Sequence, residues 1–195
     1  MPFIEFWGPP GSGKTTQARK ILSYSSAHFA GRRSLCLGAD TNQLNSLGLP
    51  RKEKKLWIYI ICGLPADFTA ALTFFFDTLH HRHTKNFFLL RIKSRALKAS
   101  RYSWILDHGL HQHILCCLAK GVLAEHRACF WKIKLSSEEI APDELHGIFA
   151  PPETLKKRIN NSKKHSKQLS QWKKSDYVDD FQRAFDALVS CNGKS

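Results

Sequence analysis

Short apolar runs alternate along the chain with longer segments whose apolar residues recur at helical spacing. The first run, residues 3–7, ends at a glycine-rich loop, and a segment of helix-forming composition follows at 14–23. Such runs, bounded by turn residues, predict buried strands, and strands separated by helices predict an α/β domain with a mainly parallel sheet flanked by helices. Further strands are predicted at 34–37, 104–106 and 145–150, and further helices at 66–79, 88–97, 110–118 and 176–189. The alternation at 130–135 favours another strand, with the tail of the preceding helix as the alternative.

The most apolar part of the chain, residues 56–76, is interrupted by Gly63, Pro65 and Asp67. A membrane-spanning helix requires about 20 consecutive, predominantly apolar residues. Beyond the interruption, apolar side chains recur at the spacing of one helix face, namely Phe68, Leu72, Phe75, Phe76 and Leu79. The pattern therefore predicts an amphipathic helix that buries this face in the core, and no membrane span.

The charge of the chain is unevenly distributed. The 195 residues include 30 Lys and Arg against 16 Asp and Glu, a formal net charge of +14, within a globular composition that is 43% hydrophobic and 24% charged. Residues 78–106 hold seven basic and no acidic residues, and residues 151–175 hold eight basic residues and one acidic residue. An overall basic field favours nucleic acid or lipid as a partner, whereas two local basic segments equally suit a protein that binds phosphate groups.

The cysteine and histidine patterns give no complete metal site. The six cysteines contain no CxxC pair, and most lie among apolar neighbours, which predicts reduced thiols in a cytoplasmic protein. The N-terminus lacks the basic and long apolar regions of a signal peptide. Histidines cluster at 80–83 and at 108–113, but no thiol or carboxylate is predicted to complete a tetrahedral set with them.

The most specific motif is the loop after the first predicted strand. Residues 8–15, Gly-Pro-Pro-Gly-Ser-Gly-Lys-Thr, match GxxxxGK[ST] between a predicted strand and a predicted helix. Glycines let backbone N–H groups surround a phosphate, Lys14 adds a positive charge, and the Thr15 hydroxyl is suited to Mg²⁺. The alternative is a chance glycine-rich turn. The predicted nucleotide-binding residues are Gly8, Pro9, Pro10, Gly11, Ser12, Gly13, Lys14, Thr15 and Thr16.

Three segments, in order, resemble the thymidylate-kinase-like group of P-loop nucleoside and nucleoside-monophosphate kinases. Residues 3–16 resemble its opening, residues 105–109 followed by Gln112 resemble its third-strand signature and next helix, and residues 150–159 resemble the start of its arginine-bearing lid. The resemblance implies a three-layer P-loop NTPase fold in a single domain, 1–195. It also implies a helical acceptor side at about 41–102, a basic lid at about 151–175, and ATP with Mg²⁺ as cofactors.

Carboxylates that follow predicted strands are the other candidate site residues. In an open α/β sheet the ligand lies beyond the carboxyl ends of the strands. Asp40 is predicted to act as base or acceptor contact, or else to start an Asx turn; Asp107 is predicted to hold Mg²⁺ with Thr15 or bind the acceptor, or else to cap a helix. The resemblance assigns Arg158, with Lys163 or Lys164, to neutralising the transferred phosphoryl group. His108 is a further candidate acceptor contact, and Glu5, within the first predicted strand, is predicted to have a structural role beneath the loop rather than a catalytic one.

These observations predict an ATP-dependent phosphotransferase. Its predicted acceptor is a small hydroxylated or phosphorylated metabolite, a class that includes nucleosides and nucleotides. The predicted catalytic residues are Lys14, Asp40, Asp107 and Arg158. Two alternatives stay open: a nucleic-acid end kinase, which the net charge suggests but no RNA-binding signature supports, and a non-catalytic nucleotide-binding regulatory module. The sequence also leaves open whether the protein forms a homodimer.

Overall fold

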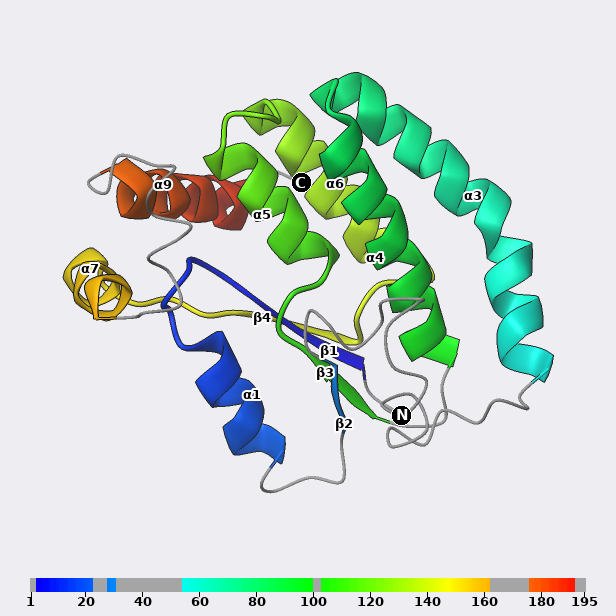
Figure 1. The fold of residues 1–195 in the computed structure, drawn as a ribbon, viewed down its shortest axis with the longest axis horizontal. Coiled ribbons are helices and arrows are strands. Elements are labelled where there is room, and N and C mark those ends of the chain that lie inside the picture. The colour runs from blue at the N-terminus through cyan, green and yellow to red at the C-terminus, as the bar shows by residue number, and fades with distance from the viewer. Residues whose placement is uncertain (1–2, 23–27, 31–53, 100–102, 162–175, 192–195) are drawn as a thin grey trace.

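The computed structural model describes residues 3–22, 28–30, 54–99, 103–161 and 176–191. Within these residues a small sheet lies against a larger set of helices (Figure 1). Its strands are β1 (Phe3–Trp7), β2 (His28–Ala30), β3 (Trp104–Leu106) and β4 (Glu144–Gly147). They are parallel and lie in the order β2-β3-β1-β4, so β1 is central, with β3 and β4 as its neighbours.

Most of the described helices lie on one face of this sheet. Figure 1 shows α4, α5 and α6 above the strands, α3 outside α4, and α1 alone on the opposite side. Their bounds are α1 (Lys14–Leu22), α3 (Lys54–Thr78), α4 (His81–Ala99), α5 (Leu110–Ala119), α6 (Glu125–Ser137), α7 (Pro152–Asn160) and α9 (Asp176–Ser190). The loop between β1 and α1 therefore lies at the edge of the sheet, beside the helices that cover one of its faces.

The predicted three-layer P-loop NTPase fold is wrong. About 70% of the described residues are helical, and the strands are only three to five residues long, so the fold is helix-rich rather than a three-layer α/β sandwich. One cause is visible in α6, where residues 130–135 were predicted as a strand. Trp131 and Leu135 are buried one helical turn apart while Ile133 is 54% exposed, so the alternation with lysines was not a strand pattern. The predicted strand at 34–37 lies outside the described residues.

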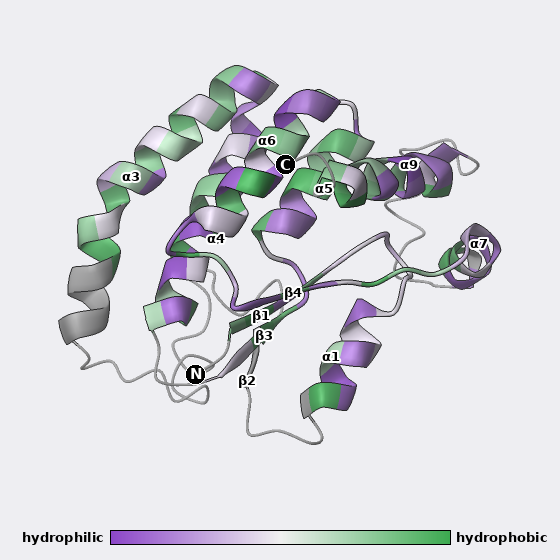
Figure 2. Cartoon of the chain, turned by 180° about the vertical axis from the view of Figure 1, so that it is seen from behind, coloured by the Kyte–Doolittle hydropathy of each residue, from purple (hydrophilic) through white to green (hydrophobic). Residues whose placement is uncertain are grey.

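The core lies mainly among the helices. Phe74 of α3 stacks on Phe87 of α4 with ring centroids 4.2 Å apart, and the edge of Trp131 from α6 meets both rings. The sheet adds two smaller clusters because successive side chains of a strand point to opposite faces. Phe3 packs with α4, whereas Phe6 packs toward α1. Figure 2 shows hydrophobic residues on α5 and on the facing parts of the other helices.

Helix α3 presents to the outside the face that was predicted to be buried. Phe68, Phe76 and Leu79 are 62%, 66% and 75% exposed, and Leu72 is also exposed. The opposite face is buried: Ala70 and Phe74 lie in the core, and Asp67, fully buried, accepts hydrogen bonds from two arginines of α4. A buried carboxylate needs such partners, so this contact favours the same rotation of the helix as the apolar packing does. Apolar spacing alone does not reveal it.

Helix α3 continues through Gly63, Pro65 and Asp67, which were predicted to interrupt it. Residues 60–78 are long and apolar enough to cross a membrane by length and composition, and 22% of that window is buried in the structure. The absence of a membrane span therefore stays a prediction.

A disulfide links α6 to the end of α9. Cys129 and Cys191 are bonded, with Cα atoms 5.8 Å apart and 62 positions between them in sequence, so the prediction of reduced cysteines is wrong for this pair. The other described cysteines are free: Cys62 is exposed, Cys116 is half-buried and Cys117 is buried. The bond joins two helices that pack at the same end of the helical layer.

Breaking this disulfide is expected to destabilise the protein. Closing a loop of this length restricts the unfolded chain, which corresponds to about 4 kcal/mol of unfolding free energy. We expect Cys129→Ser to lower the free energy of urea-induced unfolding by about that amount, and Cys62→Ser, at an exposed free thiol, to change it by less than about 0.5 kcal/mol. Alkylation of both Cys129 and Cys191 in folded, unreduced protein would contradict the disulfide.

Candidate functional site

The loop at residues 8–15 has a backbone that glycine alone adopts readily. Gly8, Gly11 and Gly13 have φ angles of 144°, 80° and 104°. A Cβ on Gly8 would lie 2.3 Å from the carbonyl oxygen of Ile148, so space as well as conformation requires glycine there. The loop leaves the carboxyl end of the central strand and enters α1, whose N-terminal end carries a partial positive charge. This is the arrangement in which proteins bind phosphate groups.

Lys14 folds back over the loop. Its Nζ donates to the carbonyl oxygens of Gly8 at 2.8 Å and Pro9 at 2.9 Å. Burial lowers the pKa of the Lys14 ammonium to about 8, against 10.5 in a free side chain, while Cys116 and Asp107 act weakly in the opposite direction. An anion at this loop would stabilise the half-buried ammonium further, beyond its bonds to the two carbonyl oxygens.

Thr15 and Asp107 are in direct contact although 92 positions separate them. The Thr15 hydroxyl donates to a carboxylate oxygen of Asp107 at 3.0 Å. Their positions after β1 and β3, which are neighbours in the sheet, bring them to the same edge. Helix α5 has Gly109 as its N-cap, with no side-chain capping bond, so the alternative role of Asp107 as a helix cap is not observed. A hydroxyl beside a carboxylate provides oxygen ligands of the kind that Mg²⁺ binds.

Arg158 reaches the loop from α7. One terminal nitrogen of its guanidinium donates to the carbonyl oxygens of Gly11 at 3.0 Å and Ser12 at 3.3 Å. The contact spans 147 positions of sequence and leaves the side chain accessible at the surface. Arg158 is thus the second cationic side chain, with Lys14, at this loop.

The structure gathers most of the predicted site residues but not all of them. Lys14, Thr15, Asp107 and Arg158 meet at one loop, and Thr16 is exposed on the first turn of α1. Asp40, Lys163 and Lys164 lie outside the described residues. His108 follows Asp107 and is half-buried.

Two polar side chains, Glu5 and Gln112, connect the loop and strand β1 to the first turn of α5. The buried carboxylate of Glu5 accepts hydrogen bonds from the backbone N–H of His111 at 2.9 Å and of Gln112 at 3.3 Å, and its second oxygen lies 3.1 Å from His111 Nδ1. Gln112 in turn accepts the N–H of Gly8 at 2.9 Å. Sequence reasoning gave Glu5 a structural role and gave Gln112 no role of its own. A carboxylate within an apolar strand was the available signal for the former.

Ser12 contributes an unsatisfied hydroxyl to the loop. Among the described residues, its Oγ is one of two buried side-chain polar atoms without a hydrogen-bond partner. Such atoms are rare in folded proteins and call for an explanation. Because Ser12 lies within the anion-binding type of loop, a bound anion would supply the missing partner.

Replacing Glu5 by glutamine tests the connection between β1 and α5. An amide of the same size offers its NH₂ group to backbone donors, so we expect Glu5→Gln to lower the free energy of unfolding by about 2–3 kcal/mol. Glu144→Gln, on the neighbouring strand β4 where the carboxylate is exposed, is the matched control, with a change below about 0.5 kcal/mol. Equal changes in the two variants, measured by chemical denaturation, would contradict the structural role of Glu5.

Comparison with known proteins adds no relative to this description. No family model, curated protein or solved structure matches the chain. Its chemistry must therefore be inferred from the loop and the side chains around it.

Proposed function

We propose that the chain binds a magnesium–nucleoside triphosphate complex at residues 8–15 and transfers the terminal phosphoryl group to a small hydroxylated or phosphorylated metabolite. The observation that carries the proposal is the meeting of four groups at one loop: positive-φ glycines, the Lys14 ammonium, the Thr15–Asp107 pair and Arg158. Each group supplies something that phosphoryl transfer requires, and they come from three separate parts of the chain, namely residues 8–15, Asp107 and Arg158.

Charge neutralisation is the main task of the loop in this proposal. A transferring phosphoryl group carries negative charge on its outer oxygens, and positioned N–H groups and cations lower the barrier by stabilising it. Lys14 is already held over the loop by two carbonyl oxygens, so binding would cost little side-chain ordering. Arg158, held at the loop by Gly11 and Ser12, adds the second positive charge.

Thr15 and Asp107 are the residues that would hold magnesium. When bound, the ion would neutralise charge on the phosphates. The hydroxyl of Thr15 now donates to Asp107, and a cation would take the place of this donated hydrogen bond. Asp107 and the neighbouring His108 are also the described residues beside the loop that are suited to contact an acceptor hydroxyl, and Asp40 stays a prediction for the same task.

The basic stretch at 78–106 gives little support to a nucleic-acid end kinase. Arg91, Lys93 and Arg95 are buried, with 3%, 5% and 6% exposure, and two of them are paired with Asp67. Charge that is buried and neutralised in this way does not bind a phosphate backbone. A non-catalytic nucleotide-binding module would have the same loop, and turnover separates it from a kinase.

Turnover assays test the proposal. We expect acceptor-dependent release of ADP from magnesium–ATP across a panel of hydroxylated and phosphorylated metabolites. Asp107→Asn should lower the turnover rate at least about 100-fold, and Lys14→Ala should weaken ATP binding by about 10–100-fold. Lys20→Ala, at an exposed lysine of the same helix, is the control. Binding of ATP without turnover by any acceptor would favour the regulatory module, and absence of binding would contradict both functions.

The low pKa of Lys14 predicts a specific pH dependence of ATP binding. In the free protein the ammonium loses its proton as pH rises through about 8, whereas a bound polyphosphate would keep it protonated. Affinity should therefore be constant below about pH 8 and fall above it, with proton uptake on binding near pH 9. Calorimetry in buffers of different ionisation enthalpy measures that uptake. Lys14→Arg, which stays charged, should abolish it, and unchanged uptake in this variant would contradict the assignment.

A further inference from the structure

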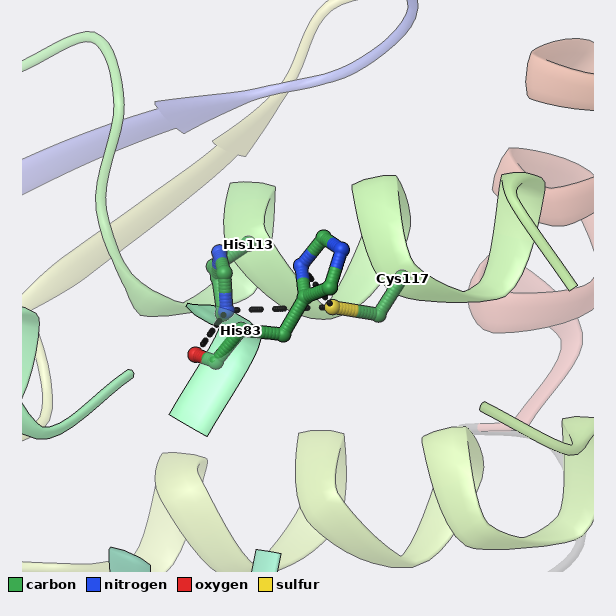
Figure 3. Close-up of side chains that lie close together, drawn as sticks. All are labelled: His83, His113 and Cys117. Atoms are coloured by element: carbon green, nitrogen blue, oxygen red, sulfur yellow. Dashed lines mark hydrogen bonds between the residues drawn. The ribbon is translucent and has the colours of Figure 1, made fainter. Parts of the chain in front are cut away.

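Two histidines and a cysteine that sequence spacing did not connect meet between α4 and α5. His83 lies in the first turn of α4, and His113 and Cys117 lie one turn apart on α5 (Figure 3). Their ligand atoms all lie within 4.8 Å of one another. The Cys117 sulfur lies 3.4 Å from Nδ1 of His83 and 3.7 Å from Nε2 of His113. All three side chains thus converge on one point.

The two sulfur–nitrogen distances agree with the edges of a tetrahedron of ligands around zinc. Zinc binds thiolate sulfur at about 2.3 Å and histidine nitrogen at about 2.0–2.1 Å, which places sulfur and nitrogen about 3.5–3.6 Å apart in tetrahedral geometry. The two observed distances, 3.4 and 3.7 Å, lie on either side of that value. The two histidine nitrogens lie within 4.8 Å of each other, against about 3.3–3.4 Å in such a tetrahedron, so binding would draw the two rings closer together.

The surroundings restrict the site to one open side. His113 and Cys117 are buried, with 4% and 0% exposure, whereas His83 is half-buried. The rings of Phe74 and Phe87 lie 5.9 and 6.4 Å from the His113 ring and form an apolar wall. A metal would have to enter from the side of His83, and apolar surroundings strengthen its bonds to the ligands.

The contacts within the cluster place Nδ1 of His83 beside the Cys117 sulfur, whereas Nε2 of His113 donates its proton to a backbone carbonyl oxygen. The Cys117 sulfur faces Nδ1 of His83 at hydrogen-bond distance, and Nε2 of His113 lies 3.0 Å from the carbonyl oxygen of His83. Metal binding would replace the sulfur–nitrogen contacts and would require Nε2 of His113 to give up its bond to that oxygen.

We propose that His83, His113 and Cys117 form a zinc site with three protein ligands and a solvent molecule in the fourth position. On binding, the Cys117 thiol forms the sulfur–zinc bond and releases its proton to solvent, while the two imidazoles bind as neutral ligands. The ion joins the start of α4 to α5, the helix whose first turn is bonded to Glu5 and Gly8. This site does not depend on the proposed phosphotransferase activity.

Metal content of the purified full chain tests the site. Cys62 is exposed and is removed by Cys62→Ser in every protein used, so that it does not bind metal adventitiously. After treatment with chelator and addition of zinc, we expect one tightly bound zinc per chain. We also expect cobalt to give the absorption of a thiolate–cobalt bond. His83→Gln and Cys117→Ser should each weaken zinc binding by at least about 100-fold.

Matched variants separate ligation from damage to the fold. Cys116→Ser and His81→Gln replace neighbouring residues of the same types outside the cluster and should keep the zinc and the cobalt spectrum. Because Cys117 is buried, His83→Gln at the half-buried position is the variant that tests ligation without loss of the fold, and a melting curve in chelator should match that of the parent. Zinc should raise the melting temperature of the parent but not of His83→Gln. Equal zinc binding in the parent and His83→Gln, or no zinc binding in the parent, would overturn the proposal.

Discussion

The carboxylate of Glu5 lies in the central strand, 1% exposed, and bonds to two backbone amides in the first turn of α5. A buried charge requires such partners, and the N-terminal end of a helix is where unpaired amides and a favourable dipole are both present. This contact fixes the start of α5 against β1. A Cβ on residue 109 would lie 2.4 Å from the Glu5 carboxyl carbon. The close approach of Glu5 to the start of α5 therefore also explains why this residue is Gly109.

This contact also determines how the glycine-rich loop at residues 8–15 is held. Because α5 begins at a fixed place, Gln112 reaches the N–H of Gly8, and Asp107, just before the helix, reaches the hydroxyl of Thr15. One end of the loop is therefore tied to the first turn of α5 and the other to Asp107, just before that helix. The side chains that we propose to bind the triphosphate and its magnesium ion are thus positioned before any ligand arrives, which reduces the ordering that binding requires.

Polar pairs add to the apolar packing of the outer helices. Asp67 of α3 is fully buried between Arg91 and Arg95 of α4, and Asp77 accepts hydrogen bonds from Arg127 and Trp131 of α6. Removing Asp67 would leave uncompensated buried charges, so its contacts reinforce the same rotation of α3 that the burial of Ala70 and Phe74 favours. The outer face is left apolar, with Phe68 and Phe76 exposed.

What could be predicted from the sequence is what local chemistry determines. The loop, the strand before it and the carboxylate at Asp107 were predictable, since glycine conformation, helix start and strand end each leave a short signature. The inward face of α3 and the Cys129–Cys191 bond were not, because each depends on a partner far away in sequence. The helical state of 130–135 was only the alternative to a favoured strand. The meeting of His83 with His113 and Cys117 likewise requires the packing of α4 on α5.

The most direct test of the central claim is hydrogen–deuterium exchange of the full chain with and without magnesium and ADP. Protection confined to the loop at 8–16, to the segment 107–112 and to α7 is the result predicted, since these are the parts that the contacts of Glu5, Asp107 and Arg158 bring together. Unchanged exchange in these segments at saturating ligand, or protection only elsewhere in the chain, would contradict it.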